Sequence, residues 1–175
     1  EIADRAAEVG VNLCVAKPLF QSTLFNLLMN LSQGTLVRST AKTTEFDFTG
    51  KRALLADDNQ LNREIASELL GMVNLIVDEA ADGKQAVAKF EASEPGTYDV
   101  ILMDVQMPVM NGYEATKAIR ALKHPQAAEI PIIAMTANAF VEDIAQSMAA
   151  GMNDHLSKPI DTQLMYEVLD RYLNR

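Results

Sequence analysis

The chain has 175 residues, 49% of them hydrophobic, and 15 Lys and Arg residues against 24 Asp and Glu give it a formal net charge of −9. This length suits one medium domain with a remainder, and the acidic balance excludes a nucleic-acid-binding surface as the expected function. No apolar run approaches the ~20 residues of a membrane span and no signal-like segment opens the chain, so we expect a cytoplasmic segment without membrane contact.

The first part of the chain is short and is followed by a linker-like stretch. Residues 1–33 contain a brief apolar run and then leucines at helical spacing between Leu24 and Leu31, which predicts an amphipathic helix. Residues 34–49 are rich in Ser and Thr and have no periodicity, so we interpret them as a linker. Cys14 is the only cysteine, which excludes an intrachain disulfide.

Beyond Gly50, short apolar strands alternate with amphipathic helices. Asp82 suits a helix N-cap, Gly151 suits a helix end, and a last helix is expected to start near Asp161. Five strand-helix units in about 125 residues predict an α/β fold, the flavodoxin-like doubly wound class, with five parallel strands in order 2-1-3-4-5. The expected strands are Arg52–Ala56, Leu75–Val77, Val100–Met103, Ile132–Met135 and Asp154–Ser157, and the expected helices include Tyr113–Leu122 and Asn138–Ala150.

A repeat links the two parts of the chain. The shared residues, at a constant offset of 141, are Gly10, Asn12, Lys17 and Pro18, which recur as Gly151, Asn153, Lys158 and Pro159. Residues 1–33 are therefore predicted to be the last strand and helix of a preceding domain of the same kind, with chance similarity between two strand-helix junctions as the alternative.

Reactive side chains stand at the expected carboxyl ends of four strands. These residues are Asp57, Asp58, Asp104, Thr136 and Lys158. Because such ends converge on one crevice in a doubly wound sheet, the three carboxylates, the hydroxyl and the amine should be neighbours. Three carboxylates repel one another unless a cation compensates, and Mg²⁺ is the hard ion that suits oxygen ligands.

This group of carboxylates, hydroxyl and amine has the chemistry for nucleophilic attack on phosphorus. A carboxylate beside Mg²⁺ can act as the nucleophile, so Asp104 would become an aspartyl phosphate while Lys158 neutralises the phosphoryl oxygens. Thr136 is suited to detect the product through a hydrogen bond. Phosphorylation adds nearly two negative charges, and such a local change can bias a two-state element.

The motifs also stand in a recognisable order. They are Asp57-Asp58, the turn Asp104-Val-Gln-Met-Pro-Val-Met-Asn-Gly, Thr136-Ala137 and Lys158-Pro159, and the spacings from Asp58 through Asp104 and Thr136 to Lys158 are 46, 32 and 22 residues. Residues 50–175 thereby resemble the receiver domain of two-component response regulators. The sequences Met-Asn-Asp-His-Leu-Ser-Lys-Pro-Ile and Met-Thr-Ala-Asn-Ala resemble those of receivers fused to hybrid sensor histidine kinases. The tail of a degenerate receiver in residues 1–33 would fit that arrangement.

The resemblance implies a phosphoacceptor and a metal site. Asp104 would be the acceptor and would hold Mg²⁺ together with Asp58 and the backbone carbonyl of Gln106. Asp57 would support the metal directly or through water. The side chains of Gln106 and Asn138 would flank the path of the attacking water and tune the lifetime of the acyl phosphate.

The resemblance also implies a switch. Lys158 would pair with the acceptor or the phosphoryl group, Thr136 would be the switch hydroxyl, and Pro159 would be a cis-proline that aims Lys158 into the crevice. Receivers often carry Tyr or Phe three residues before this lysine, whereas this chain has His155. We therefore expect His155 either to weaken the coupling between phosphorylation and the nearby face, or to make it pH-sensitive, unless it is an ordinary strand residue.

The expected function is transfer of a phosphoryl group from phosphohistidine to Asp104. The donor would be the transmitter domain of a histidine kinase, in the same chain or a partner, and the next acceptor a histidine phosphotransfer domain. The segment would catalyse only its own phosphorylation and dephosphorylation. Its parent protein would be a hybrid histidine kinase, of a kind that can be anchored in an inner membrane.

Two other functions share parts of the pattern. A phosphatase of the haloacid dehalogenase type also uses Asp, Mg²⁺, Thr or Ser, and Lys, but it needs a second acid two residues after its nucleophile, where this chain has Gln106. A receiver-shaped adaptor that works without phosphorylation needs none of the acceptor, metal or switch residues. Residues 50–175 retain all of them, so the adaptor interpretation suits residues 1–33 better.

Overall fold

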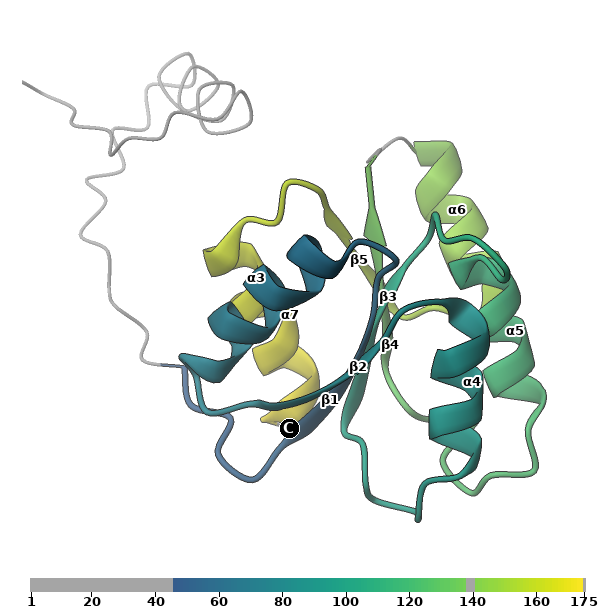
Figure 1. The fold of residues 1–175 in the computed structure, drawn as a ribbon, viewed down its shortest axis with the longest axis horizontal. Coiled ribbons are helices and arrows are strands. Elements are labelled where there is room, and N and C mark those ends of the chain that lie inside the picture. Colours follow the sequence, from purple (N-terminus) through teal and green to yellow (C-terminus); the bar gives the residue numbers. More distant parts are fainter. Residues whose placement is uncertain (1–45, 138–140, 175) are drawn as a thin grey trace, which may run out of the picture. The chain divides into compact units, whose positions relative to one another are not determined.

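The computed structural model describes residues 46–137 and 141–174 (Figure 1). The interpretations of residues 1–33 and of the linker up to residue 45 lie outside the described residues. Within the described part, strands and helices alternate as β1 Arg52–Ala56, α3 Gln60–Gly71, β2 Ile76–Ala80, α4 Gly83–Glu91, β3 Val100–Asp104, α5 Gly112–Ala121, β4 Ile132–Thr136, α6 Val141–Ala150, β5 Asp154–Ser157 and α7 Thr162–Leu173.

The strands form one parallel sheet in the order β2-β1-β3-β4-β5, which confirms the predicted fold class. The second strand differs from its prediction, because it begins at Ile76 and continues through Asp78 and Glu79 to Ala80. β2 lies at the edge of the sheet, where half-exposed positions tolerate acidic side chains. The predicted range, Leu75 to Val77, therefore overlaps the observed strand only at Ile76 and Val77.

Two hydrophobic clusters cover the two faces of the sheet. Because side chains alternate along a strand, Leu55 of β1 packs with α3 and α7, whereas its neighbour Leu54 packs with α4 and α5. Figure 1 shows α3 and α7 on one side of the sheet and α4, α5 and α6 on the other. Both leucines are fully buried, and each such side chain contributes roughly 1.5–3 kcal/mol to folding.

The compact unit begins at Phe46, four residues before the expected domain start at Gly50. Phe48 is buried in the cluster under α3 and α7, and Phe46 packs against it. The backbone N–H of Phe48 also donates to the Val73 carbonyl over 2.8 Å. Phe46 and Phe48, which belong to the predicted linker, thus pack with the domain.

Side-chain caps fix where the helices start, at the same edge of the sheet as the strand ends. Asp82 caps α4, as predicted, and Asp161, near which the last helix was expected to start, caps α7. Asn59 caps α3, and Asn111 forms a capping box at the start of α5. After α6, Gly151 takes a positive φ of 99°, the conformation for which a glycine helix end was predicted.

No helix within residues 46–137 and 141–174 has both the length and the apolar character that crossing a membrane requires.

Candidate functional site

The structure brings together the acids that follow β1 and end β3. Asp57, Asp58 and Asp104 each direct a carboxylate oxygen into one group, and these oxygens lie within 4.8 Å of one another. Asp57 and Asp104 are buried, whereas Asp58 is exposed. The cluster is therefore closed by the sheet on one side and open to solvent on the other.

Lys158, from the segment after β5, bridges two of these acids. Its Nζ lies 2.6 Å from Oδ2 of Asp57 and 2.6 Å from Oδ2 of Asp104. Burial raises the pKa of Asp104, and the hydrogen bond and charge of Lys158 offset only part of that effect. Burial opposes the charge of Lys158, but its hydrogen bonds to both acids outweigh burial and raise its pKa. Lys158 therefore stays an ammonium ion beside a carboxylate of increased basicity.

The first turn of α3 satisfies the buried carboxylate of Asp57. Its Oδ1 accepts hydrogen bonds from the backbone N–H of Asn59 over 2.9 Å and from Nδ2 of Asn62 over 3.3 Å. Asn62 was not among the residues predicted for the site. Its position in the sequence could have indicated this role. Asn62 lies one helical turn after the acid pair, and side chains in the first turn of a helix can reach the loop that precedes the helix.

A pocket of about 500 Å³ opens beside the acids. Asp58, Gln106 and Thr136 line it, together with residues of the turn after β3. The backbone N–H of Gln106 donates to Oδ1 of Asp104 over 3.1 Å, so Gln106 lies directly beside Asp104, and Thr136 is buried at the end of β4. Asn138, the other residue predicted to flank the water path, lies outside the described residues.

The turn after β3 depends on a close backbone approach. A Cβ on Gly112 would overlap with the carbonyl oxygen of Asp104, so only glycine fits at the start of α5. Earlier in the same turn, Val109 takes a φ of 68° with its side chain 79% exposed. A β-branched residue is strained in this left-handed conformation.

Two further predicted residues lie at β5 and just beyond it. The Lys158–Pro159 peptide bond is cis. His155 is on β5, with its side chain 34% exposed and its Nδ1 atom 3.9 Å from Oδ1 of Asp154. Asp154 also pairs with Arg171 of α7 over 3.2 Å, so His155 shares an acid with the last helix.

The donor set fits a hard divalent cation. Asp57, Asp58 and Asp104 offer carboxylate oxygens only, whose charge exceeds that of the Lys158 ammonium ion. Oxygen ligands with an open, solvent-facing side are what Mg²⁺ prefers, because this ion keeps several of its waters.

Comparison with known proteins identifies the fold family. The sequence pattern described as the response regulator receiver domain matches residues 53–170. The chain belongs to this family. Its resemblance to receiver domains, predicted from the motifs, is thereby confirmed.

Relatives of this receiver domain include hybrid kinases. The hybrid signal transduction histidine kinase I of Dictyostelium discoideum is 39% identical over 122 residues, which cover 69% of this chain and 7% of that protein. The signal transduction histidine-protein kinase BarA of Escherichia coli K12 is 32% identical over 173 residues, which cover 97% of this chain and 18% of BarA. The chain spans between 7% and 20% of the length of such curated relatives.

Two solved structures are informative neighbours. The receiver domain of the sensor histidine kinase PA1611 from Pseudomonas aeruginosa PAO1, with a magnesium ion coordinated in its active-site cleft, is 38% identical. It has a TM-score of 0.65, over 73% of this chain and all of that one. The receiver domain of Ssk1 from Saccharomyces cerevisiae, crystallised with the histidine phosphotransfer protein Ypd1, appears in a match of 26% identity. That match has a TM-score of 0.62 over 71% of this chain and 89% of the matched chain.

Proposed function

We propose that this receiver domain accepts a phosphoryl group from a phosphohistidine onto Asp104 in a Mg²⁺-dependent reaction. The observation that carries the proposal is the buried carboxylate of Asp104, which lies 2.6 Å from the Lys158 ammonium and beside two further acids. A nucleophile, a fixed positive charge and a cation-attracting group at one strand end are the parts that phosphoryl transfer requires.

The metal would be held by the carboxylates of Asp58 and Asp104 and the backbone carbonyl of Gln106, with Asp57 in support. The grouping of the three acids within 4.8 Å supports this assignment, as does the magnesium ion in the PA1611 receiver. When bound, Mg²⁺ would neutralise charge on the phosphoryl oxygens.

The chain's own residues perform the transfer. A carboxylate oxygen of Asp104 attacks the phosphorus, the P–N bond to the donor imidazole breaks, and its electron pair stays on the ring nitrogen, which takes up a proton. Lys158 moves its hydrogen bond from Asp104 to a phosphoryl oxygen. Hydrolysis reverses the modification when water attacks the phosphorus and releases inorganic phosphate and the Asp104 carboxylate.

Two residues would report the modification. Thr136, buried at the end of β4 and lining the pocket, would donate its hydroxyl to a phosphoryl oxygen. His155, on the neighbouring strand, would pass the change to the α6-β5-α7 face with a dependence on pH. Gln106, at the pocket wall, and Asn138 would set how long the acyl phosphate lasts.

The donor would be the transmitter domain of a histidine kinase, and the next acceptor a histidine phosphotransfer domain. The Ssk1 match, from a crystal that also contains Ypd1, and the similarity to BarA support this pairing. The parent protein would be a hybrid histidine kinase whose receiver works in the cytoplasm. Residues 1–33 would be the tail of a preceding receiver-like domain, joined by a linker to the unit that starts at Phe46.

Intact-mass measurement tests the proposal. We expect the chain to gain one phosphoryl group when incubated with Mg²⁺ and acetyl phosphate or a phosphorylated kinase, and Asp104→Asn to gain none. Asp58→Ala should stay folded and also fail to gain it. A folded wild-type chain that takes up no phosphoryl group would favour the phosphorylation-independent adaptor, and a gain that survives Asp104→Asn would move the acceptor elsewhere.

A further inference from the structure

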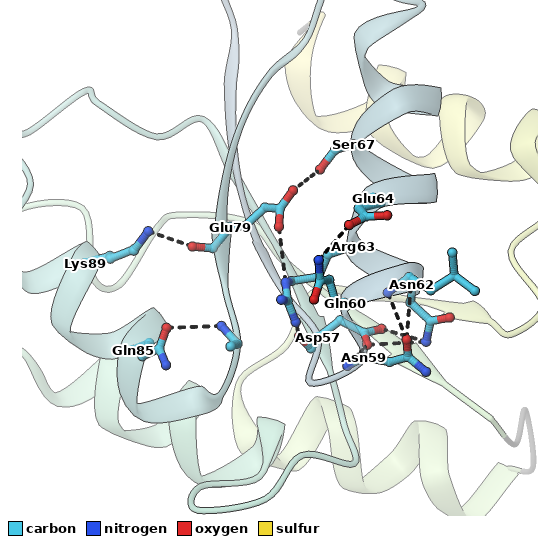
Figure 2. A network of polar contacts seen from close by, with 12 residues as sticks. Asp57, Asn59, Gln60, Asn62, Arg63, Glu64, Ser67, Glu79, Gln85 and Lys89 are labelled. Carbon is cyan, nitrogen blue, oxygen red and sulfur yellow. Dashed lines mark hydrogen bonds and ion pairs between the residues drawn. The ribbon is translucent and has the colours of Figure 1, made fainter.

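A polar network joins helix α3 to the loop after β1 and to the edge strand β2 (Figure 2). Its centre is Arg63, one helical turn into α3. The Arg63 Nη1 atom donates to the backbone carbonyl of Asp57 over 2.7 Å, and its Nε atom donates to Oε2 of Glu79 over 3.1 Å. One guanidinium group thus joins the loop after β1 to the edge strand β2.

Glu79 is itself held from both faces of the sheet. Its Oε1 atom accepts from the hydroxyl of Ser67, which is one turn beyond Arg63 on α3, over 2.8 Å. Its backbone carbonyl accepts from Nζ of Lys89, on α4, over 2.6 Å. The Arg63 side chain is only 13% exposed, so its position is set by these contacts rather than by solvent.

The carbonyl that Arg63 holds belongs to the peptide between Asp57 and Asp58. The Asp57 carboxylate has several hydrogen-bond partners of its own, including Asn59 and Lys158. Asp58 differs, because its side chain is exposed and no hydrogen bond to its carboxylate is found among the described residues. The direction of the Asp58 side chain therefore depends on the backbone that carries it.

We propose that Arg63, anchored by Glu79, is a positioning residue that fixes the Asp57–Asp58 peptide and so holds the Asp58 carboxylate toward Asp104 for Mg²⁺. This inference rests on the proposed function, since it concerns the metal site assigned there. The two-point geometry requires arginine, because a lysine ammonium is a single point and cannot span a carbonyl and a carboxylate in the same fixed fork.

The sign of the effect separates positioning from simple electrostatics. Arg63 carries a positive charge near the acids. If it acted only through this charge, it would repel Mg²⁺, and removal of Arg63 would strengthen Mg²⁺ binding. A positioning role predicts the reverse, because a freed peptide lets the Asp58 carboxylate move away. Groups that orient metal ligands typically change metal affinity by 10- to 100-fold.

Calorimetric titration of the whole chain with MgCl₂ alone measures this affinity without any phosphoryl transfer. We expect Arg63→Met to weaken Mg²⁺ binding on the order of tenfold, and Arg63→Lys to weaken it similarly although it keeps the charge. Arg52→Met is the matched control, because Arg52 of β1 also pairs with an acid of the edge strand, Asp78, over 3.1 Å. That variant removes the same charge and should bind Mg²⁺ within twofold of the wild-type chain.

Equal or tighter Mg²⁺ binding by folded Arg63→Met, or full affinity in Arg63→Lys, overturns the inference. If Arg63→Met does not fold, Glu79→Gln provides the second test, since it keeps Arg63 and removes only its charged anchor. An unchanged Mg²⁺ affinity in that variant overturns the inference as well. Failure of the wild-type chain to bind Mg²⁺ is a separate outcome, which overturns the metal site of the proposed function and the role of Arg63 with it.

Discussion

Lys158 and Asp104, 54 positions apart in the chain, form an ion pair of 2.6 Å between their side chains. Lys158 makes a second contact of the same length with Asp57. We predict that Lys158→Met lowers the rate of phosphorylation by acetyl phosphate about 100-fold, the scale of losing one fixed donor to developing charge. The time course of intact mass at saturating Mg²⁺ measures this rate.

Lys51→Met is the control for that substitution. Lys51 pairs with Asp99 over 3.1 Å at the opposite end of the sheet, so its loss makes the same change in net charge far from the acids. It should leave the rate of phosphorylation unchanged. Equal losses in both variants would show that total charge, and not the position of Lys158, controls the reaction.

Gly112→Ala should destabilise the domain. The added Cβ would overlap with the Asp104 carbonyl oxygen, and such overpacking costs about 1–3 kcal/mol in the free energy of unfolding. Gly71→Ala is the matched control, because a Cβ there meets nothing within 4 Å and the residue ends α3. Urea unfolding should show Gly71→Ala to be neutral or stabilising by up to about 1 kcal/mol. Equal stabilities of the two variants would contradict the close approach at Gly112.

Val109→Gly should stabilise the domain. The φ of 68° at Val109 strains a side chain that is 79% exposed and gains little from packing. Relief of about 1–2 kcal/mol of left-handed strain exceeds the entropic cost of glycine, which leaves a gain of roughly 0.5–1 kcal/mol in the free energy of unfolding. Val87→Gly, inside α4, should instead lose about 1 kcal/mol or more. A lower urea midpoint for Val109→Gly would disprove strain at this turn.

The alkaline stability of the domain should depend on Tyr98. Burial, together with a hydrogen bond to Asp78 and the charge of that acid, raises the pKa of Tyr98 from 10.0 to about 12. The folded state therefore holds this proton more tightly than the unfolded state, so the contribution to stability is complete below pH 10 and is lost as the pH rises to about 12. Ultraviolet titration of tyrosinate should show a group that titrates near pH 12 and that Tyr98→Phe removes. An unchanged titration curve in that variant would refute the assignment.

The fold was predictable from the sequence because its three central strands, β1, β3 and β4, are short apolar runs. Val100 to Met103 is buried on both faces, and such a run does not depend on tertiary detail to be recognised. The edge strand was predicted too short, because Asp78 and Glu79 carry the polarity of a loop and gain their strand geometry from pairing with β1. Edge pairing is a tertiary effect that a local pattern does not report.

That the candidate site residues lie together was predictable for a different reason. Asp104 and Thr136 end strands β3 and β4, and Lys158 directly follows β5. Parallel topology brings such strand ends together without further information. Arg63 and Glu79 could not be predicted in this way. They act through a backbone carbonyl and a side-chain pair between two elements, and a helix arginine near an edge-strand glutamate has no distinctive spacing.

Phe48 has a practical consequence for making this domain. Its ring is 1% exposed, and deletion of a buried phenylalanine side chain costs about 3–5 kcal/mol. A recombinant protein that started at Gly50, where the sequence composition changes, would lose that ring and a large share of a small domain's stability. Expression should therefore begin at or before Phe46, so that both aromatic rings are retained.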